Sequence, residues 1–223
     1  MKNSILTFLL CLGLSLAAFP VHADLINYDY SMAADGTMTT ANSWAIVDTF
    51  DSDRPGWTYS GNGKIRNGSV IGRYAAPFNA SVMKAADQTN FFAVPEDIAP
   101  GATVKDLSAD VTFGGNEYNY LGLFWGSADT YNSIEFYNGE TLIAVYAGDD
   151  VLNPANGDQA SSLTNNYVNF YLSQNFDMVR LVSTSYAFEL DNLAVGVHAP
   201  VPGAALLGLI GLGFAGRKLR RHA

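Results

Sequence analysis

Short apolar segments separated by turn residues mark the chain between residues 24 and 198, and no stretch keeps a helical period of 3.6 for three turns. From Leu107 to Phe113, apolar side chains occupy the odd positions and polar ones lie between them. Since alternate side chains of a strand point to opposite faces, this pattern predicts a half-buried β-strand. The same alternation over 167–172 predicts another, and further strands are predicted at 179–183 and 188–195.

Two other patterns complete the β assignment. The segment 120–125 is nearly all apolar, which is typical of a strand covered on both faces. Asn138-Gly139 divides 134–146 into two strands and predicts a hairpin with a type I′ turn, and Asn67-Gly68 repeats this signal. Many short strands separated by turns predict an all-β fold, a single β-sandwich of the jelly-roll-like kind.

Two segments are less regular. The pattern over 24–44 fits either an edge strand or a loose lead-in. The polar interval 148–166 is long for a connection, and connections of that length are usually functional or disordered. No internal repeat is found.

The first 23 residues have the composition of an export signal. Lys2 gives a positive start, 5–18 is apolar, and the small-residue pattern ending at Ala23 predicts cleavage before Asp24. Cys11 follows a leucine rather than a small residue, which disfavours a lipoprotein. We therefore predict a signal peptide over 1–23.

The last 25 residues, 199–223, have the composition of a second targeting signal. The segment 203–216 is uncharged and apolar, and we predict that it is a short transmembrane helix. A buried core helix is the alternative, which the terminal position and the basic end disfavour. The cations that follow favour the cytoplasmic side; they are Arg217, Lys218, Arg220 and Arg221.

Pro200-Val201-Pro202, the apolar run and the basic end together resemble the PEP-CTERM sorting signal of bacterial surface proteins. That resemblance implies processing by exosortase, a membrane-embedded transpeptidase, and release of the domain to the cell surface or its polysaccharide. Val201 stands where the family usually has glutamate, so an uncut membrane anchor is the competing hypothesis. The segments 120–137, 187–195 and 68–77 resemble an uncharacterised family of exosortase-dependent surface proteins, which implies a sandwich and extracellular residence.

The composition of 24–198 restricts its partners. This segment has no cysteine, and its seven basic and 21 acidic residues give a net charge of −14. A domain of this length buries a sufficient core without disulfides. The acidic balance disfavours nucleic acid and makes bound divalent cations plausible.

Catalytic chemistry is poorly represented. Histidine occurs only at positions 22, 198 and 222, so the body of the domain lacks the parts of a Ser-His-Asp triad or a histidine-ligated zinc site. Glu189 and Asp191 are expected on one face of a strand, about 7 Å apart, within the range of glycosidase carboxyl pairs. A solvated face is the favoured interpretation, a calcium or structural polar role comes next, and the protein is predicted not to be an enzyme.

Calcium is a possible cofactor, and no other is expected. An EF-hand is excluded, because Pro55 occupies a ligand position and Asn62 stands where the bidentate glutamate belongs. An irregular site would use aspartates of two groups, and the metal-ligating residues are otherwise unknown. The groups are Asp48, Asp51 and Asp53, and Asp149, Asp150 and Asp158 of the long loop.

Aromatic residues offer a different function. Trp125 is expected in the core, whereas Trp57, beside a Pro-Gly pair, is expected to be exposed and could stack on sugars. The sequence thus predicts an exported surface or matrix protein of a bacterium, associated with exopolysaccharide and held by the membrane before cleavage, with a structural role. The alternative is a carbohydrate-binding module, with or without calcium, and a carboxylate-based hydrolase is the third hypothesis.

Overall fold

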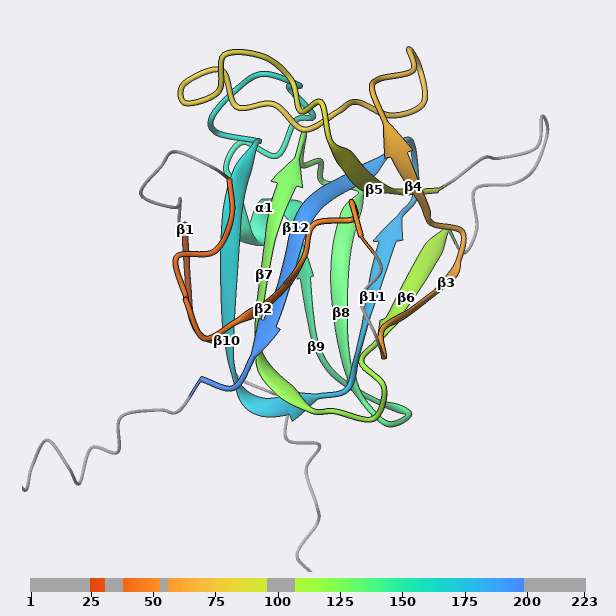
Figure 1. The fold of residues 1–223 in the computed structure, drawn as a ribbon, viewed down its shortest axis with the longest axis vertical. Helices are drawn as coiled ribbons and strands as arrows, with labels where there is room; N and C mark the ends of the chain where they lie inside the picture. Colours follow the sequence, from red (N-terminus) through yellow and green to blue (C-terminus); the bar gives the residue numbers. More distant parts are fainter. Residues whose placement is uncertain (1–24, 31–37, 53–55, 96–106, 199–223) are drawn as a thin grey trace, which may run out of the picture.

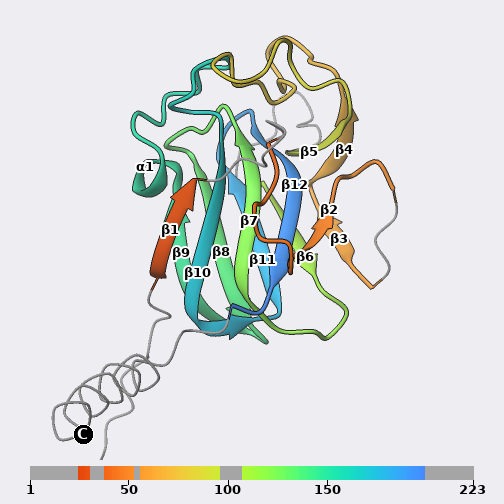
Figure 2. The same cartoon turned by 60° about the vertical axis from the view of Figure 1, so that its left-hand side comes forward.

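The computed structural model describes residues 25–30, 38–52, 56–95 and 107–198 of the protein. Two antiparallel β-sheets pack face to face, with one short helix beside them (Figures 1 and 2). The predicted all-β class and β-sandwich are therefore confirmed.

Several predicted segments fall outside these ranges. The signal peptide, its cleavage position at Ala23 and Asp24, the sorting tail and the transmembrane segment 203–216 all lie outside the described residues. Within the described ranges, no helix has the length and hydrophobicity needed to cross a membrane.

Seven strands make the first sheet and five the second. The first contains β1 (Leu25–Tyr30), β2 (Ile46–Asp48), β4 (Lys64–Asn67), β5 (Asn90–Val94), β7 (Tyr118–Gly126), β10 (Asn166–Phe176) and β12 (Phe188–Gly196). The second contains β3 (Thr58–Gly61), β6 (Ser108–Thr112), β8 (Asn132–Asn138), β9 (Thr141–Ala147) and β11 (Met178–Ser183). Helix α1 (Gly148–Val151) follows β9.

The strands predicted at 107–113, 120–125, 134–146, 167–172, 179–183 and 188–195 are all present. Spatial order in the first sheet is β1-β10-β7-β12-β5-β4, and in the second β3-β6-β11-β8-β9. Strand β1 pairs with β10 at the edge of the sheet. Of the segment 24–44, residues 25–30 are therefore an edge strand, whereas the described residues 38–44 form no strand. Strand β12 pairs with β7 along one side and with β5 and then β2 along the other.

Aromatic rings bridge the two sheets at the centre of the sandwich. Phe136 of β8 lies 5.8 Å from Phe170 of β10, and Phe113 lies 5.9 Å from Phe176, measured between ring centroids. These rings, like the apolar side chains of the predicted alternation, are fully buried. Rings of this size bury large apolar areas and account for much of the packing between the sheets.

The outer face of the first sheet is also covered. Tyr120 and Tyr167 point away from the core yet are fully buried, because the segment 38–48 crosses over them. The Tyr120 hydroxyl donates to Asn169 Oδ1 at 2.6 Å. A Cβ at Gly122, between the two tyrosines, would lie 2.7 Å from the Tyr167 hydroxyl, so only glycine fits there. The prediction that β7 is buried on both faces is confirmed.

Two turn predictions need correction. The β8–β9 connection starts one residue later than predicted, because Asn138 still pairs with Thr141 and Gly139 alone has a positive φ, at 57°. This fits a type II′ turn better than type I′. Gly68 also has a positive φ, but β4 pairs with β5 instead of forming a hairpin with the residues that follow.

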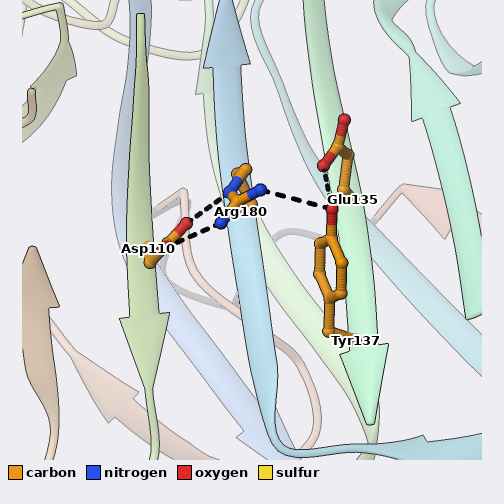
Figure 3. Close-up of polar contacts among 4 residues, drawn as sticks. All are labelled: Asp110, Glu135, Tyr137 and Arg180. Carbon is orange, nitrogen blue, oxygen red and sulfur yellow. Dashed lines mark hydrogen bonds and ion pairs between the residues drawn. The ribbon is translucent and has the colours of Figure 1, made fainter. Parts of the chain in front are cut away.

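A row of polar side chains crosses the outer face of the second sheet (Figure 3). Arg180 on β11 donates from Nε and Nη2 to the two carboxylate oxygens of Asp110 on β6, at 2.6 and 3.1 Å. On the other side its guanidinium lies 5.2 Å from the ring centre of Tyr137, whose hydroxyl donates to Glu135 at 2.6 Å. The row links β6, β11 and β8 and favours their register.

Replacing Arg180 by methionine should lower the free energy of unfolding by about 0.5–1 kcal/mol, because the pair is partly exposed and solvent screens it. Chemical denaturation of the purified protein measures this. Lys84→Met, at an exposed lysine, is the control and should change nothing. Equal losses in both variants would show that the row contributes no net stability.

Candidate functional site

A pocket of about 310 Å³ opens where β7 ends and β12 begins, among the loops at the top of Figure 1. Four connections form its wall: 70–74, 127–131, 157–159 and 185–187. The connection 157–159 belongs to the polar interval 148–166, whose length predicts a functional or disordered loop. Glu189 of β12 belongs to the lining as well. We call this the loop-end pocket.

Glu189 is buried, with 2% of its surface exposed, and both carboxyl oxygens have partners. Its Oε1 accepts from the Ala75 N–H and its Oε2 from the Ser127 hydroxyl, both at 2.8 Å. Burial nevertheless raises the pKa of Glu189 to about 8, and the nearby charge of Asp129 adds to the rise. At neutral pH this carboxyl group is therefore mostly protonated.

Ser127 holds an uncommon backbone conformation directly after β7. Its φ is 38°, in the left-handed region that non-glycine residues seldom adopt. The Ser127 N–H donates to Asn165 Oδ1 at 2.8 Å, and Asn165 Nδ2 donates to the Asp158 carbonyl at 2.7 Å. These bonds connect the long loop to the end of β7, so that the pocket wall is preorganised.

Asp129 and Tyr131 lie side by side in the β7–β8 connection. The Tyr131 hydroxyl donates to the Tyr186 carbonyl at 2.6 Å, which links this connection to the one before β12. Burial raises the pKa of Asp129, and the Tyr131 hydroxyl opposes that rise. Gly157 has a φ of 69°, and a Cβ there would lie 2.9 Å from Asp129 Cγ. Glycine at 157 thus leaves room for the carboxylate.

The side chains of Gln159 and Ser185 complete the polar lining, and neither forms a hydrogen bond with another residue in the described ranges. Together with the partly exposed Asp129, they offer donors and acceptors to a ligand. Tyr74, Tyr131 and Tyr186 line the pocket as well, and its surface is mostly polar. This combination suits a small polyhydroxylated molecule.

Asp191 borders a different pocket, of about 580 Å³, whose lining includes Met83 and Phe124 on the outer face of the first sheet. Burial, and then the neighbouring Asp87, raise the pKa of Asp191 to about 9. Glu189 and Asp191 therefore share a face, as predicted, but they do not open into one cleft. They are 2% and 3% exposed, so the solvated face expected for them is wrong.

The predicted calcium ligands have other partners where the structure describes them. Asp48 is buried and accepts from the Phe50 N–H at 2.8 Å and the Tyr59 hydroxyl at 2.7 Å. Asp51, Asp150 and Asp158 each accept backbone N–H groups. Asp53 lies outside the described residues, and Asp149 is exposed on α1. Among the described residues, no three His, Cys, Asp or Glu side chains lie close enough to hold a metal ion. A calcium effect stays a prediction.

The tryptophans differ in part from expectation. Trp125 is fully buried and stacks on Phe188 at 4.7 Å, as predicted. Trp57 was expected to be exposed but is partly buried, edge-on to Phe113 at 5.1 Å. Trp44 is instead the exposed tryptophan, at 44%, and lies over Gly196 near the last described residue, His198.

Sequence reasoning missed the residues of the loop-end pocket other than Glu189. Asp129 and Gln159 belong to irregular connections, for which no periodicity predicts which side chains meet. The available signal was the position of Asp129 shortly after the nearly all-apolar segment 120–125, together with the length of the interval 148–166.

Comparisons with known proteins give little further information. No protein-family model matches the chain, and no curated protein matches it significantly. Among solved structures, it is similar to the CBM22-1 and GH10 modules of Clostridium thermocellum endo-1,4-beta-D-xylanase 10B, crystallised with xylohexaose. Identity is 14% and the TM-score 0.34, over 69% of this chain and 28% of that one. The chain thus spans little more than a quarter of that protein's length, and so distant a likeness transfers neither ligand nor activity.

Proposed function

We propose that this protein is a glycan-binding surface protein whose loop-end pocket holds the sugar. The observation that carries the proposal is the polar pocket beside the long loop, lined by hydrogen-bonding side chains and three tyrosines from four connections. Ligand sites orient what they bind with a few precisely placed polar groups, and aromatic side chains are frequent in their lining. The strained backbone of Ser127 at the same place supports it, since such conformations cluster at functional sites.

The export route and topology belong to the same proposal. Residues 1–23 are a signal peptide, 24–198 the surface domain and 199–223 a PEP-CTERM-like tail that exosortase processes. The domain is a jelly-roll-like sandwich, and the order β5-β12-β7-β10 facing β6-β11-β8-β9 supports this finer description, since it matches two interlocked Greek keys. The mature protein resides at the cell surface or in the exopolysaccharide.

A non-catalytic role fits the separation of the two buried carboxyl groups. Glycoside hydrolysis needs two carboxyl groups flanking one bond. Glu189 and Asp191 border separate pockets. Asp129 lines the loop-end pocket together with Glu189, but Glu189 is only 2% exposed and both of its carboxyl oxygens already accept hydrogen bonds from the protein. We therefore propose binding without hydrolysis.

Co-sedimentation of the full-length protein, purified in detergent, with the exopolysaccharide of its host tests the proposal. Saturable binding is expected, and Asp129→Asn should weaken it about tenfold or more, because a hydrogen bond to a charged acceptor is worth about 1.5–3 kcal/mol. Loss of binding in EDTA would add a calcium requirement.

Glu140→Asn, in the β8–β9 turn at the other end of β8 from Tyr131, is the matched control. It should bind as the wild type does. Absence of saturable binding by the wild type would refute glycan binding and would leave a structural role in the matrix. Equal weakening by both variants would place the binding surface elsewhere.

A further inference from the structure

We infer that the loop-end pocket takes the end of a neutral glycan, holding one terminal sugar unit rather than an internal stretch of chain. This inference rests on the proposed function and specifies the class of ligand.

The dimensions of the pocket favour a single unit. Its volume of about 310 Å³ is at the lower limit of small-molecule sites, which run from about 300 to 1,000 Å³. Four connections contribute to its wall, and Glu189 from β12 lies among them. A site walled by loops in this way receives a ligand end-on, whereas an internal stretch of chain needs a groove with two open ends.

The aromatic residues are distributed as an end-binding site requires. Among residues 38–52, 56–95 and 107–198, Trp44 is the one exposed aromatic side chain, and the pocket does not include it. An extended chain lying across a sheet would need a row of exposed rings on which successive sugars stack. The tyrosines of this site, Tyr74, Tyr131 and Tyr186, line the pocket instead.

The charges in the pocket lining and over the whole domain favour a neutral sugar as the ligand. Arg73 and Asp129 bring opposite charges to the lining, and the buried Glu189 adds no full charge at neutral pH. The net charge of −14 over residues 24–198 also repels polyanionic chains at long range. Besides Asp129, which can accept from a sugar hydroxyl, the Gln159 amide and the Ser185 hydroxyl are neutral and suit hydroxyl groups.

The test counts chain ends. The exopolysaccharide of the host is partly hydrolysed to several mean lengths, and binding of the full-length protein is measured at equal sugar mass. End recognition predicts that the capacity per mass doubles when the number of ends doubles. A panel of monosaccharides (glucose, galactose, mannose, xylose, N-acetylglucosamine and glucuronic acid) then competes, and at least one neutral member should displace the glycan whereas glucuronic acid should not.

Gln159→Ala provides the second variant, because this exposed side chain can be removed without disturbing the fold. It should weaken displacement by the monosaccharide several-fold, and Glu140→Asn should leave it unchanged. Capacity that stays constant or falls with the number of ends, or displacement only by longer fragments, would overturn end recognition while leaving glycan binding intact. Stronger displacement by glucuronic acid would overturn neutrality. Absence of binding at every length would instead refute the proposed function.

Discussion

The stability of the protein should fall as the pH rises from about 5 to about 8, with buried carboxyl groups as the cause. Glu189 has a pKa of about 8 in the folded protein, against an ordinary value of 4.5. Between these values the folded state keeps the proton that the unfolded state has lost. The free energy of unfolding therefore decreases with pH in this window and levels off above it.

Asp191 adds to the effect in the same direction. Its pKa of about 9 compares with an ordinary 3.8, so its window runs from about 4 to about 9. Each pH unit corresponds to about 1.4 kcal/mol for each group, so the two groups together should cost up to about 8 kcal/mol between pH 5 and pH 8. Urea denaturation at several pH values measures the loss.

Glu189→Gln and Asp191→Asn isolate the contribution of each carboxyl group to the pH dependence of the free energy of unfolding. Each amide resembles the protonated acid in shape and does not ionise. Each variant should flatten its part of the pH dependence and be the more stable protein above pH 8. Asp149→Asn, at an exposed position on α1, is the control and should follow the wild-type curve. Parallel curves for the wild type and Glu189→Gln would show that this group ionises normally in the folded state.

The strands could be predicted because their side chains repeat with a period that the backbone imposes. The alternation at 107–113 fixed both the position of β6 and the inward face of Ala109 and Val111. Burial of Glu189 could not be predicted in this way. Its position on the outer face follows from the period, but the residues that cover it, Ala75 and Ser127, come from distant connections.

The β8–β9 turn likewise combines a feature that the local sequence predicts with one that depends on the partner strand. Gly139 was correctly assigned to a turn, yet the register of β8 with β9 moved the turn by one residue, because Asn138 remains in the ladder. Register depends on what both strands bury and not on the turn dipeptide alone. The loop-end pocket depends on four such connections at once, which explains why the fold was easier to predict than the site.

Trp125→Ala should be among the most destabilising substitutions in the domain, lowering the free energy of unfolding by about 3–5 kcal/mol. The side chain is fully buried and stacks on Phe188 at 4.7 Å. It lies at the end of β7, so its loss also weakens the support of the loop-end pocket. Denaturation followed by far-ultraviolet circular dichroism measures the change without relying on tryptophan fluorescence.

Trp125→Phe separates the contribution of ring packing to stability from that of the buried indole Nε1. The indole Nε1 is buried and has no hydrogen-bond partner among the described residues. An unsatisfied buried donor costs about 1–3 kcal/mol, so removing it should offset part of the volume that phenylalanine leaves empty. Trp125→Phe should therefore cost well under half as much as Trp125→Ala. If the two variants lose equal stability, the Nε1–H is satisfied in solution, and its partner then lies outside the described residues or is water.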